Sequence, residues 1–424
     1  MQNLVRLNAF CGIFYFHFSL ASRFLTSLQV HLGFSSSAIG NTLGFIKLVT
    51  SFLSPVVSSV ADTRKRHRSM IIFQTILRLV PVCVMWFAYH EGALSLWVFF
   101  VLNSLISLAA TGVWPMSDSL ILASLEDPAI YGRVRLWGAL TYGVGNLFIG
   151  CLIQWSDSFS PMFSTSILTA LIAVPAVYYV LPPFANQVKP KEPITWPVIK
   201  SILFTSPSTQ VFFFNSIIIG GAMSLVESLL FVAMERSMDG SSPVIAGASV
   251  FISVMFEIPI FQLAPQLIKT YGTKKMLIIA NLAWVVRAIG YTLFDHAWVV
   301  LLLELLHGIT FGLFYSAAVH ICVQQSPPGM ESTMQSLLDM TYAGFGVALG
   351  DMVGGVLFDL IGTSSTFVLF SVLVIVSTGL CLKFFVESSS PDKMKPIPTE
   401  PDKESQPDHE FGGQELEQPV DIPS

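Results

Sequence analysis

Three ionisable residues reach a similar depth inside long apolar stretches of the chain. Arg287 lies 13 residues into the apolar run over 274–294, and Glu304 lies eight residues into the run over 296–322. Arg287 would then lie about 20 Å from one membrane surface and Glu304 about 12 Å from the other. In a hydrocarbon core about 30 Å thick these two depths nearly coincide. His307 follows Glu304 by three residues, on the same helical face.

The chemistry open to such a cluster is proton transfer. An ionisable side chain in hydrocarbon is costly, so it usually pairs with another group or lines a cavity. We expect Glu304 to carry a proton, Arg287 to be its switchable partner and His307 to act as a relay; a fixed ion pair with a hydrogen-bonded histidine is the alternative. Two further acids inside apolar runs, Glu227 and Glu257, are the other candidates for the proton carrier.

The first half of the chain carries cations at mid-depth without an acid at their level. Lys47 and Arg78 lie about 16 Å and about 14 Å from the nearer end of their runs, and His17 is at a comparable depth. Two cations without a local acid predict either a site for an anionic solute or ion pairs with acids of the second half. Trp114 and Tyr142 are aromatic candidates for the same cavity. Asp351 lies near the outer end of its run, where we expect it to be hydrated.

The composition sets the class of protein. Of 424 residues, 53% are apolar and 12% are charged, whereas a soluble domain carries roughly 25% charge. A soluble enzyme, a nucleic-acid binder and a secreted scaffold are therefore excluded as first interpretations. Residues 387–424 hold ten acids and three lysines. We expect this stretch to be a disordered, acidic cytoplasmic tail.

The apolar runs predict an all-α integral membrane protein with twelve transmembrane helices, since each run is long enough to cross a bilayer. A break rich in Lys and Pro at 183–205 separates two sets of six. We expect an N-terminal six-helix bundle over 1–183, a cytoplasmic loop over 184–205 and a C-terminal six-helix bundle over 206–386. The runs are 4–29, 36–61, 69–88, 94–121, 132–154, 160–182, 206–233, 243–265, 274–294, 296–322, 332–358 and 364–386.

Basic residues predict the orientation. Of the 22 Lys and Arg, 17 fall at the N-terminus, in alternate loops or from Lys383 onward. Positive charge accumulates on the cytoplasmic side of membrane proteins. Both termini are therefore expected to be cytoplasmic, and the plasma membrane is favoured over an organelle membrane.

The two halves echo each other. The Thr-Tyr pair at 141–142, followed by Gly150, recurs at 341–342, followed by Gly350. With the division into six and six, this echo predicts parallel repeats related by an axis along the membrane normal.

The segment Ala-Asp-Thr-Arg-Lys-Arg at 61–66 is similar to the Gly-x-x-x-Asp-Arg-x-Gly-Arg-Arg signature of the major facilitator superfamily. The chain resembles that superfamily over roughly residues 4–386, which implies its fold of two six-helix bundles. The signature implies an inner-side gate that involves Asp62 and Arg66. Asp118 lies near the inner end of its run, where Arg133 or Arg135 can pair with it, and we assign Asp118 and Arg135 to the same gate.

Two further segments, at 131–138 and 306–312, resemble the group that contains lactose, nucleoside and phenylpropionate permeases. Lactose permease has a similar set of acid, arginine and histidine, with the histidine before the acid. This resemblance implies proton-coupled symport of a small organic solute by alternating access, and the two mid-depth cations make a carboxylate the candidate solute. A nucleoside or sugar symporter is the alternative, as is a non-transporting receptor on the same scaffold.

No phosphate-binding loop, metalloprotease motif or nucleophile elbow appears in the sequence. We therefore expect no enzyme activity, no metal and no cofactor. The expected partners are a small solute, protons and membrane lipid, with no nucleic acid, and the expected state is a monomer. The five cysteines stand singly in apolar runs and are expected to be small buried hydrophobes.

Overall fold

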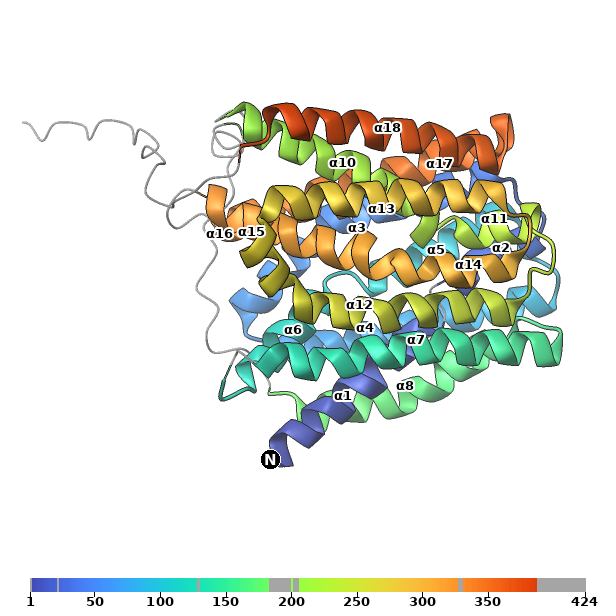
Figure 1. Cartoon of the computed structure of the whole chain (residues 1–424). Helices are drawn as coiled ribbons and strands as arrows, with labels where there is room; N and C mark the ends of the chain where they lie inside the picture. Colours follow the sequence, from blue (N-terminus) through green and yellow to red (C-terminus); the bar gives the residue numbers. More distant parts are fainter. Residues whose placement is uncertain are drawn as a thin grey trace, which may run out of the picture.

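The fold consists of helices that run nearly parallel to one another (Figure 1). It is described from a computed structural model, for residues 2–20, 23–127, 130–182, 200, 206–326 and 331–386. The predicted loop over 184–205, apart from Lys200, and the predicted tail over 387–424 lie outside the described residues. We call the end where α1 begins and α18 ends the terminal side, and the other end the far side.

Twelve of the described helical segments are long and apolar enough to cross a membrane, which confirms the predicted number of spans. The first half contains α1 (Gln2–Ser19), α2 (Phe24–His31), α3 (Ser36–Arg64), α4 (His67–His90), α5 (Leu96–Ala109), α6 (Val113–Ala123), α7 (Tyr131–Ser156) and α8 (Ser160–Val180). The second half begins with α10 (Pro207–Glu227), α11 (Leu230–Ser237), α12 (Pro243–Tyr271) and α13 (Thr273–Leu293). It continues with α14 (Ala297–Leu303), η2 (Glu304–Leu306), η3 (Gly308–Leu313), α15 (Phe314–Gln325), α16 (Glu331–Asp339), η4 (Met340–Gly346), α17 (Val347–Ile361) and α18 (Thr363–Phe384).

Serine residues begin four of the spans. The side chains of Ser35, Ser95, Ser206 and Ser242 each accept a hydrogen bond from a backbone amide in the first turn of the helix that follows. In two of these helices a proline occupies the first turn, where its missing N–H removes no helical hydrogen bond. Local sequence therefore determines where these spans start.

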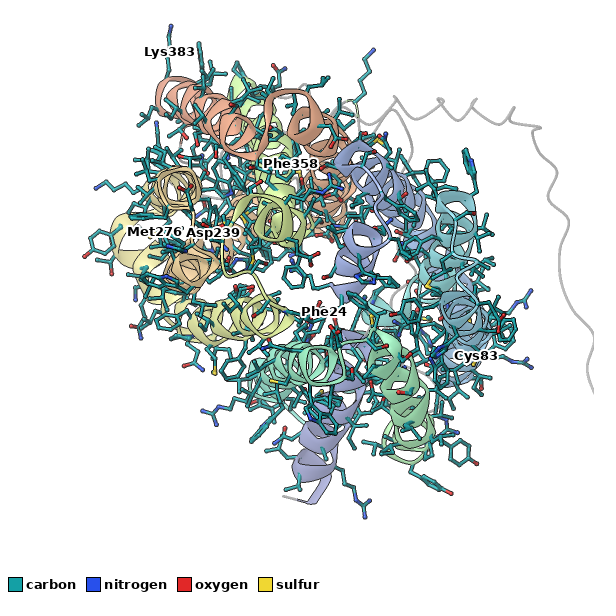
Figure 2. All side chains as sticks on the ribbon, turned by 90° about the vertical axis from the view of Figure 1, so that its right-hand side faces the viewer. Phe24, Cys83, Asp239, Met276, Phe358 and Lys383 are labelled. Atoms are coloured by element: carbon teal, nitrogen blue, oxygen red, sulfur yellow. The ribbon has the colours of Figure 1, made fainter. Side chains whose placement is uncertain are left out.

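The two halves meet along two helix pairs, α3 against α17 and α7 against α12. Figure 2 looks along the helices from the far side, with Phe24 near the centre of the bundle and Cys83 at its periphery. The far-side ends of both pairs touch through backbone. A Cβ on Gly40 would lie 2.2 Å from the carbonyl oxygen of Asp351, and one on Gly247 would lie 2.5 Å from that of Asn146. We call these two contact regions the α3–α17 seam and the α7–α12 seam.

The two seams repeat the same contacts. Gly40 and Gly247 are 207 residues apart, and Asp351 and Asn146 are 205 apart. The same seams bring Gly150 against Pro243 and Gly355 against Ser36, again 205 and 207 residues apart. The internal repeat is therefore present in the packing. Gly150 corresponds to Gly355 in these contacts rather than to Gly350, which packs against α10, so the register read from the sequence echo was wrong at this end.

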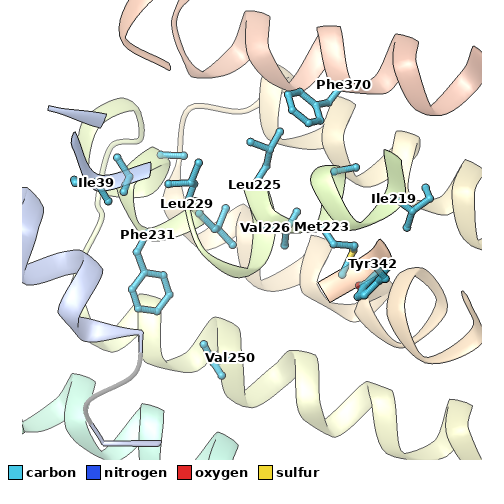
Figure 3. Close-up of a cluster of buried hydrophobic side chains, with 14 of the residues drawn as sticks. Ile39, Ile219, Met223, Leu225, Val226, Leu229, Phe231, Val250, Tyr342 and Phe370 are labelled. Atoms are coloured by element: carbon cyan, nitrogen blue, oxygen red, sulfur yellow. The ribbon is translucent and has the colours of Figure 1, made fainter. Parts of the chain in front are cut away.

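Apolar side chains close the far side between the seams. Ile39 of α3 lies among second-half residues such as Leu225 and Leu229 (Figure 3). Phe24 of α2 packs on Phe231 of α11, with ring centroids 5.3 Å apart, and both rings are buried. The far side is thus sealed by a continuous core cluster that draws on both halves.

Polar contacts surround this apolar closure. Ser27 of α2 donates to the carboxylate of Glu235 in α11. Arg236 donates to Ser36 and to the carbonyl of Phe34, and lies 3.4 Å from Asp359. Every one of these contacts except Arg236–Asp359 joins the two halves.

Candidate functional site

A cavity of about 1490 Å³ lies between the two halves. It is lined by α1, α6 and α7 from the first half and by α10–α12, η2, η3 and α15 from the second, and it reaches Tyr131 and Pro265 on the terminal side. Pockets for drug-sized ligands measure roughly 300–1,000 Å³. The cavity therefore has room for a small solute together with water, and the closed far side makes the terminal side its route of access.

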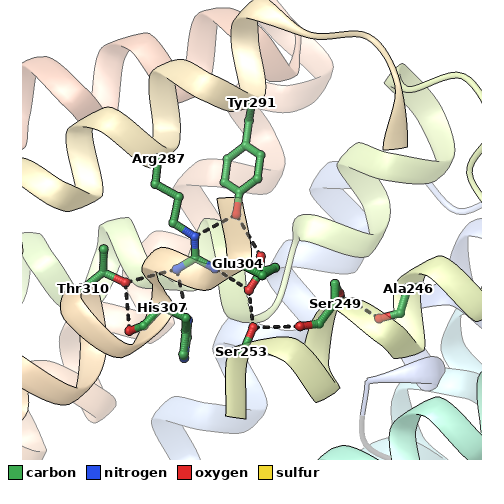
Figure 4. A network of polar contacts seen from close by, with 8 residues as sticks. All are labelled: Ala246, Ser249, Ser253, Arg287, Tyr291, Glu304, His307 and Thr310. Carbon is green, nitrogen blue, oxygen red and sulfur yellow. Dashed lines mark hydrogen bonds and ion pairs between the residues drawn. The ribbon is translucent and has the colours of Figure 1, made fainter. Parts of the chain in front are cut away.

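One wall of the cavity is a polar network centred on Arg287 (Figure 4). Its guanidinium is fully buried, and Nη2 lies 2.5 Å from Oε2 of Glu304. Nε donates to the hydroxyl of Tyr291 at 2.8 Å, and that hydroxyl donates to Oε1 of Glu304 at 2.8 Å. Ser253 donates to Oε2 of Glu304. The structure thus brings together the arginine and acid whose depths were matched from the sequence.

His307 completes the network on the cavity side. Its Nδ1 lies 3.0 Å from Nη1 of Arg287. A guanidinium only donates hydrogen bonds, so Nδ1 accepts and the hydrogen of the neutral ring belongs on Nε2. Thr310 accepts a second bond from Nη1 at 3.1 Å. Glu304 and His307 both line the cavity, so this network borders it directly.

The tenth span places these residues by departing from α-helical winding. A 3₁₀ turn covers Glu304–Leu306, and a π-helical stretch covers Gly308–Leu313. Such turns inside long helices are frequent at functional sites. Gly308 allows the π stretch to approach α12, since a Cβ there would lie 2.3 Å from the carbonyl of Phe256.

Five more charged residues line the same cavity: Glu227, Glu257, Arg23, Arg133 and Arg135. Glu227 faces the cavity from the C-terminal end of α10, and Glu257 faces it from the middle of α12. Arg23 follows the break between α1 and α2, and our sequence reasoning left it without a role. Arg23 could have been identified from the sequence, because an arginine inside an apolar run is a candidate functional residue.

A second cavity, of about 490 Å³, lies in the first half and is lined by both Lys47 and Arg78. Trp114 and Tyr142 line both cavities. His17 lines neither, because its face of α1 turns toward α8, where its Nδ1 lies 2.9 Å from the hydroxyl of Thr169. The structure therefore does not place His17 with the other candidates for solute binding.

The two cations of this second cavity differ in their surroundings. Lys47 Nζ lies 3.6 Å from Asp351 of the second half and donates to Ser228 at 2.8 Å. This is the cross-half pairing that our sequence analysis left open. Asp351 is fully buried, so the expectation of a hydrated acid was wrong. Arg78 is 5% exposed and lies over the ring of Phe18, and its Nε and Nη1 have no hydrogen-bond partner among the described residues.

The internal repeat of the chain accounts for the lack of an acidic residue beside Arg78. Glu304 is the eighth residue from the start of α14, and Asn103 is the eighth residue from the start of α5, the corresponding helix of the first half. Arg78 and Arg287 both come from the third span of their half. At this position of the fourth span the second half carries a carboxylate and the first half an amide, and both Arg78 and Asn103 line the second cavity.

The residues assigned to a gate all lie on the terminal side. Asp62 pairs with His67 at 2.7 Å, while Arg66 is exposed. Arg135 lies 3.7 Å from Asp118, which accepts a hydrogen bond from Tyr15 at 3.3 Å. Within the described residues, no group of three or more His, Cys, Asp or Glu could hold a metal ion.

Residues 5–369 match the sequence profile of the MFS_1 like family. The chain belongs to this family. The predicted resemblance to the major facilitator superfamily is confirmed, and with its twelve apolar helices this MFS_1 like protein is a multi-pass membrane protein.

Relatives with similar sequences include proteins named as permeases and transporters. The maltose permease of Geobacillus stearothermophilus is 25% identical over 358 residues, which cover 84% of this chain and 87% of the relative. The putative nucleoside transporter YegT of Escherichia coli is 25% identical, over 77% of this chain and 78% of its own. A crystal structure of the nucleoside transporter NupG superposes with a TM-score of 0.74 at 16% identity, covering 92% of this chain and all (100%) of that one. The fold of two six-helix bundles is thereby confirmed.

Proposed function

We propose that this protein is a proton-coupled symporter of a neutral sugar- or nucleoside-like solute. The observation that carries the proposal is the Arg287–Glu304–His307 network in the wall of a cavity that both halves line. The named relatives transport maltose or nucleosides. Aromatic side chains such as Trp114 and Tyr142 offer flat apolar surface for a sugar ring or base, and the cavity acids offer hydrogen-bond acceptors.

The network links proton binding to the state of the cavity. A carboxylate beside an arginine favours its charged form, and that preference falls if the two groups separate. Protonation of Glu304 would also turn one of its oxygens from an acceptor into a donor. Arg287, Tyr291 and Ser253, which all donate toward this carboxylate or lie against it, would then have to rearrange.

The charge distribution supports an orientation for this cycle. Basic residues concentrate on the terminal side, which the positive-inside rule assigns to the cytoplasm. The far side is then extracellular, and the structure corresponds to an inward-facing state. We propose a plasma-membrane location, a monomer, and a terminal-side gate that includes Asp62, Arg66, Asp118 and Arg135.

Transport by purified protein tests the proposal. Proteoliposomes would be given an inward proton gradient and radiolabelled maltose, uridine or a carboxylate such as phenylpropionate. The expected result is gradient-driven accumulation of maltose or uridine by the wild type, with loss of accumulation but continued exchange in Glu304→Gln. The exposed Glu91→Gln is the matched control. Normal accumulation by Glu304→Gln would remove Glu304 from the coupling, and binding without flux would indicate a receptor.

A carboxylate is the second candidate solute, and Arg78 favours it. A buried guanidinium without a carboxylate partner would be stabilised by an anionic ligand. A hydrogen bond to a charged group contributes about 1.5–3 kcal/mol. If the solute is a carboxylate, Arg78→Gln should raise its apparent KM by roughly tenfold to a hundredfold and leave neutral solutes unchanged. A uniform loss for every solute would assign Arg78 to stability.

A further inference from the structure

Arg78 is a buried cation without an acidic partner. It is 5% exposed, and none of the ion pairs between described residues includes it. Its Nε and Nη1 are enclosed and have no hydrogen-bond partner in that part of the chain. Cζ lies 4.8 Å from the centre of the Phe18 ring, a contact that offsets part of the cost of burial but supplies no negative charge. Because burial of an ionised group is costly unless the group is paired, Arg78 calls for a further partner.

The second half of the chain has an acid in this role. Arg287 belongs to the third span of its half, as Arg78 does, and Nη2 of Arg287 lies 2.5 Å from Oε2 of Glu304. Glu304 is the eighth residue of its span, and the eighth residue of the corresponding first-half span is Asn103. The first half thus keeps the cation and carries an uncharged amide in place of the acid.

The second cavity, which Arg78 lines, collects hydrogen-bond donors from two further helices. α3 contributes Lys47, Ser51 and Ser54, whose spacing of four and three residues places them on one helical face. α5 contributes Asn103 and Ser107, which are one turn apart. Ammonium, hydroxyl and amide groups can all donate. No Asp or Glu of the described chain lines this cavity, so the lining favours a ligand that accepts hydrogen bonds and carries negative charge.

Lys47 does not change the charge balance of the second cavity. Its Nζ lies 3.6 Å from Asp351, which balances it. The charge left without compensation is therefore that of Arg78. Water in a polar cavity of about 490 Å³ can hydrate the guanidinium but cannot neutralise it.

We infer that the second cavity binds a small monovalent inorganic anion such as chloride, in addition to the solute of the larger cavity. Two parallel hydrogen bonds from a guanidinium to a carboxylate require two adjacent nitrogens, and every such pair includes Nε or Nη1. Both of these nitrogens are enclosed in Arg78, which leaves Nη2 as the one available to a ligand. A spherical anion needs no paired contact. The inference goes beyond the proposed function, since it concerns a second ligand and holds whichever solute is transported.

Thermal unfolding of the purified full chain tests the inference in the absence of any solute. Sodium gluconate would be replaced stepwise by sodium chloride in detergent, at constant ionic strength. A ligand that binds the folded state raises the unfolding midpoint with its concentration. The expected result is a rise that saturates, of roughly 2 °C once chloride exceeds its dissociation constant tenfold.

Asn103→Asp is the decisive variant. It places a fixed negative charge in the second cavity, at the position where the other half carries Glu304. That charge balances Arg78 and repels an anion, so the midpoint in gluconate should rise above that of the wild type and the response to chloride should disappear. Arg78→Gln should also lose the response. Arg64→Gln, at an exposed arginine of α3, is the matched control and should keep it.

The outcomes decide between an inorganic anion and a carboxylate. An unsaturated response, or an equal response in the wild type and in Asn103→Asp, would overturn the inference. Stabilisation by acetate but not by chloride would assign the second cavity to a carboxylate and overturn it as well. If neither variant folds, anomalous diffraction from wild-type crystals grown in bromide decides, and no peak beside Arg78 would reject the site. Failure to transport maltose or uridine would reject the proposed function and leave a chloride result standing.

Discussion

Oδ2 of Asp359, at the far-side end of α17, lies 2.7 Å from the backbone nitrogen of Ser37, in the first turn of α3. Oδ1 accepts from the backbone nitrogen of Ser36 at 3.0 Å. A carboxylate of the second half therefore caps a helix of the first half, where free N–H groups and the helix dipole favour negative charge. Arg236 lies 3.4 Å from the same carboxylate.

Asp359→Asn should loosen the far side. The amide keeps one acceptor for the two backbone donors and loses the charge that faces the helix dipole and Arg236. We expect the far-side open fraction to rise by roughly tenfold, because a bond to a charged group is worth about 1.5–3 kcal/mol and this one is partly exposed. Spin labels on Trp155→Cys and Leu360→Cys, two exposed far-side positions in α7 and α17, measure the open fraction by pulsed electron paramagnetic resonance. Asp295→Asn, at an exposed far-side acid, is the control, and an equal effect there would exclude the cap.

Gly40→Ala should prevent full closure of the α3–α17 seam. The added Cβ would lie 2.2 Å from the carbonyl oxygen of Asp351, which is backbone and cannot rotate away. Overpacking of this kind costs about 1–3 kcal/mol. Thermal unfolding in detergent should report a lower midpoint, and the spin labels a longer distance. Gly379→Ala is the control, because its Cβ would meet nothing within 4 Å. A normal distance in Gly40→Ala would contradict this account of the seam.

Tyr291→Phe should destabilise the second half. The hydroxyl accepts from Arg287 and donates to Glu304, both at 2.8 Å, and its removal leaves two buried charged groups short of a partner. The expected loss is about 1–3 kcal/mol of unfolding free energy. Thermal melting of the purified protein measures it. Tyr179→Phe, at a ring that is 80% exposed, should melt like the wild type, and equal midpoints for both variants would argue against the network.

Glu235 should make far-side closure depend on pH. Its partial burial between α2 and α11 raises the pKa of its carboxyl from 4.5 to about 7. The closed state then holds the proton more tightly than an open, hydrated one, so closure is favoured most below pH 4.5 and this advantage disappears as the pH rises through 7. Because the side chain remains partly exposed, we expect the observed midpoint between these two values.

The measurement uses an Asp351→Asn background, in which the fully buried acid of the α3–α17 seam cannot titrate. The far-side open fraction should increase with pH in that protein and stay constant after a further Glu235→Gln substitution. A pH dependence that survives in the double variant would show that another group is responsible.

The sequence predicts single helices better than contacts between them. Apolar length is a property of one segment, so all twelve spans could be predicted. Arg287 and Glu304 could be matched because depth along neighbouring helices limits which side chains can meet. His17 and Asp351 could not be placed in this way. Depth does not say which face of α1 meets α8, or that the second and eleventh spans form a seam, and both depend on packing between distant segments.

The winding of the tenth span has a consequence for how this chain can vary. Between Glu304 and Leu313 the span changes from a 3₁₀ turn to a π-helical stretch. Each residue of an α-helix turns the chain by about 100°. Deletion of one residue from Gly308–Leu313 would restore ordinary winding and turn Glu304 away from Arg287 while every side chain of the network remained in the sequence. The direction in which this acid points is therefore encoded in the number of residues that follow it, and a substitution scan alone would not detect it.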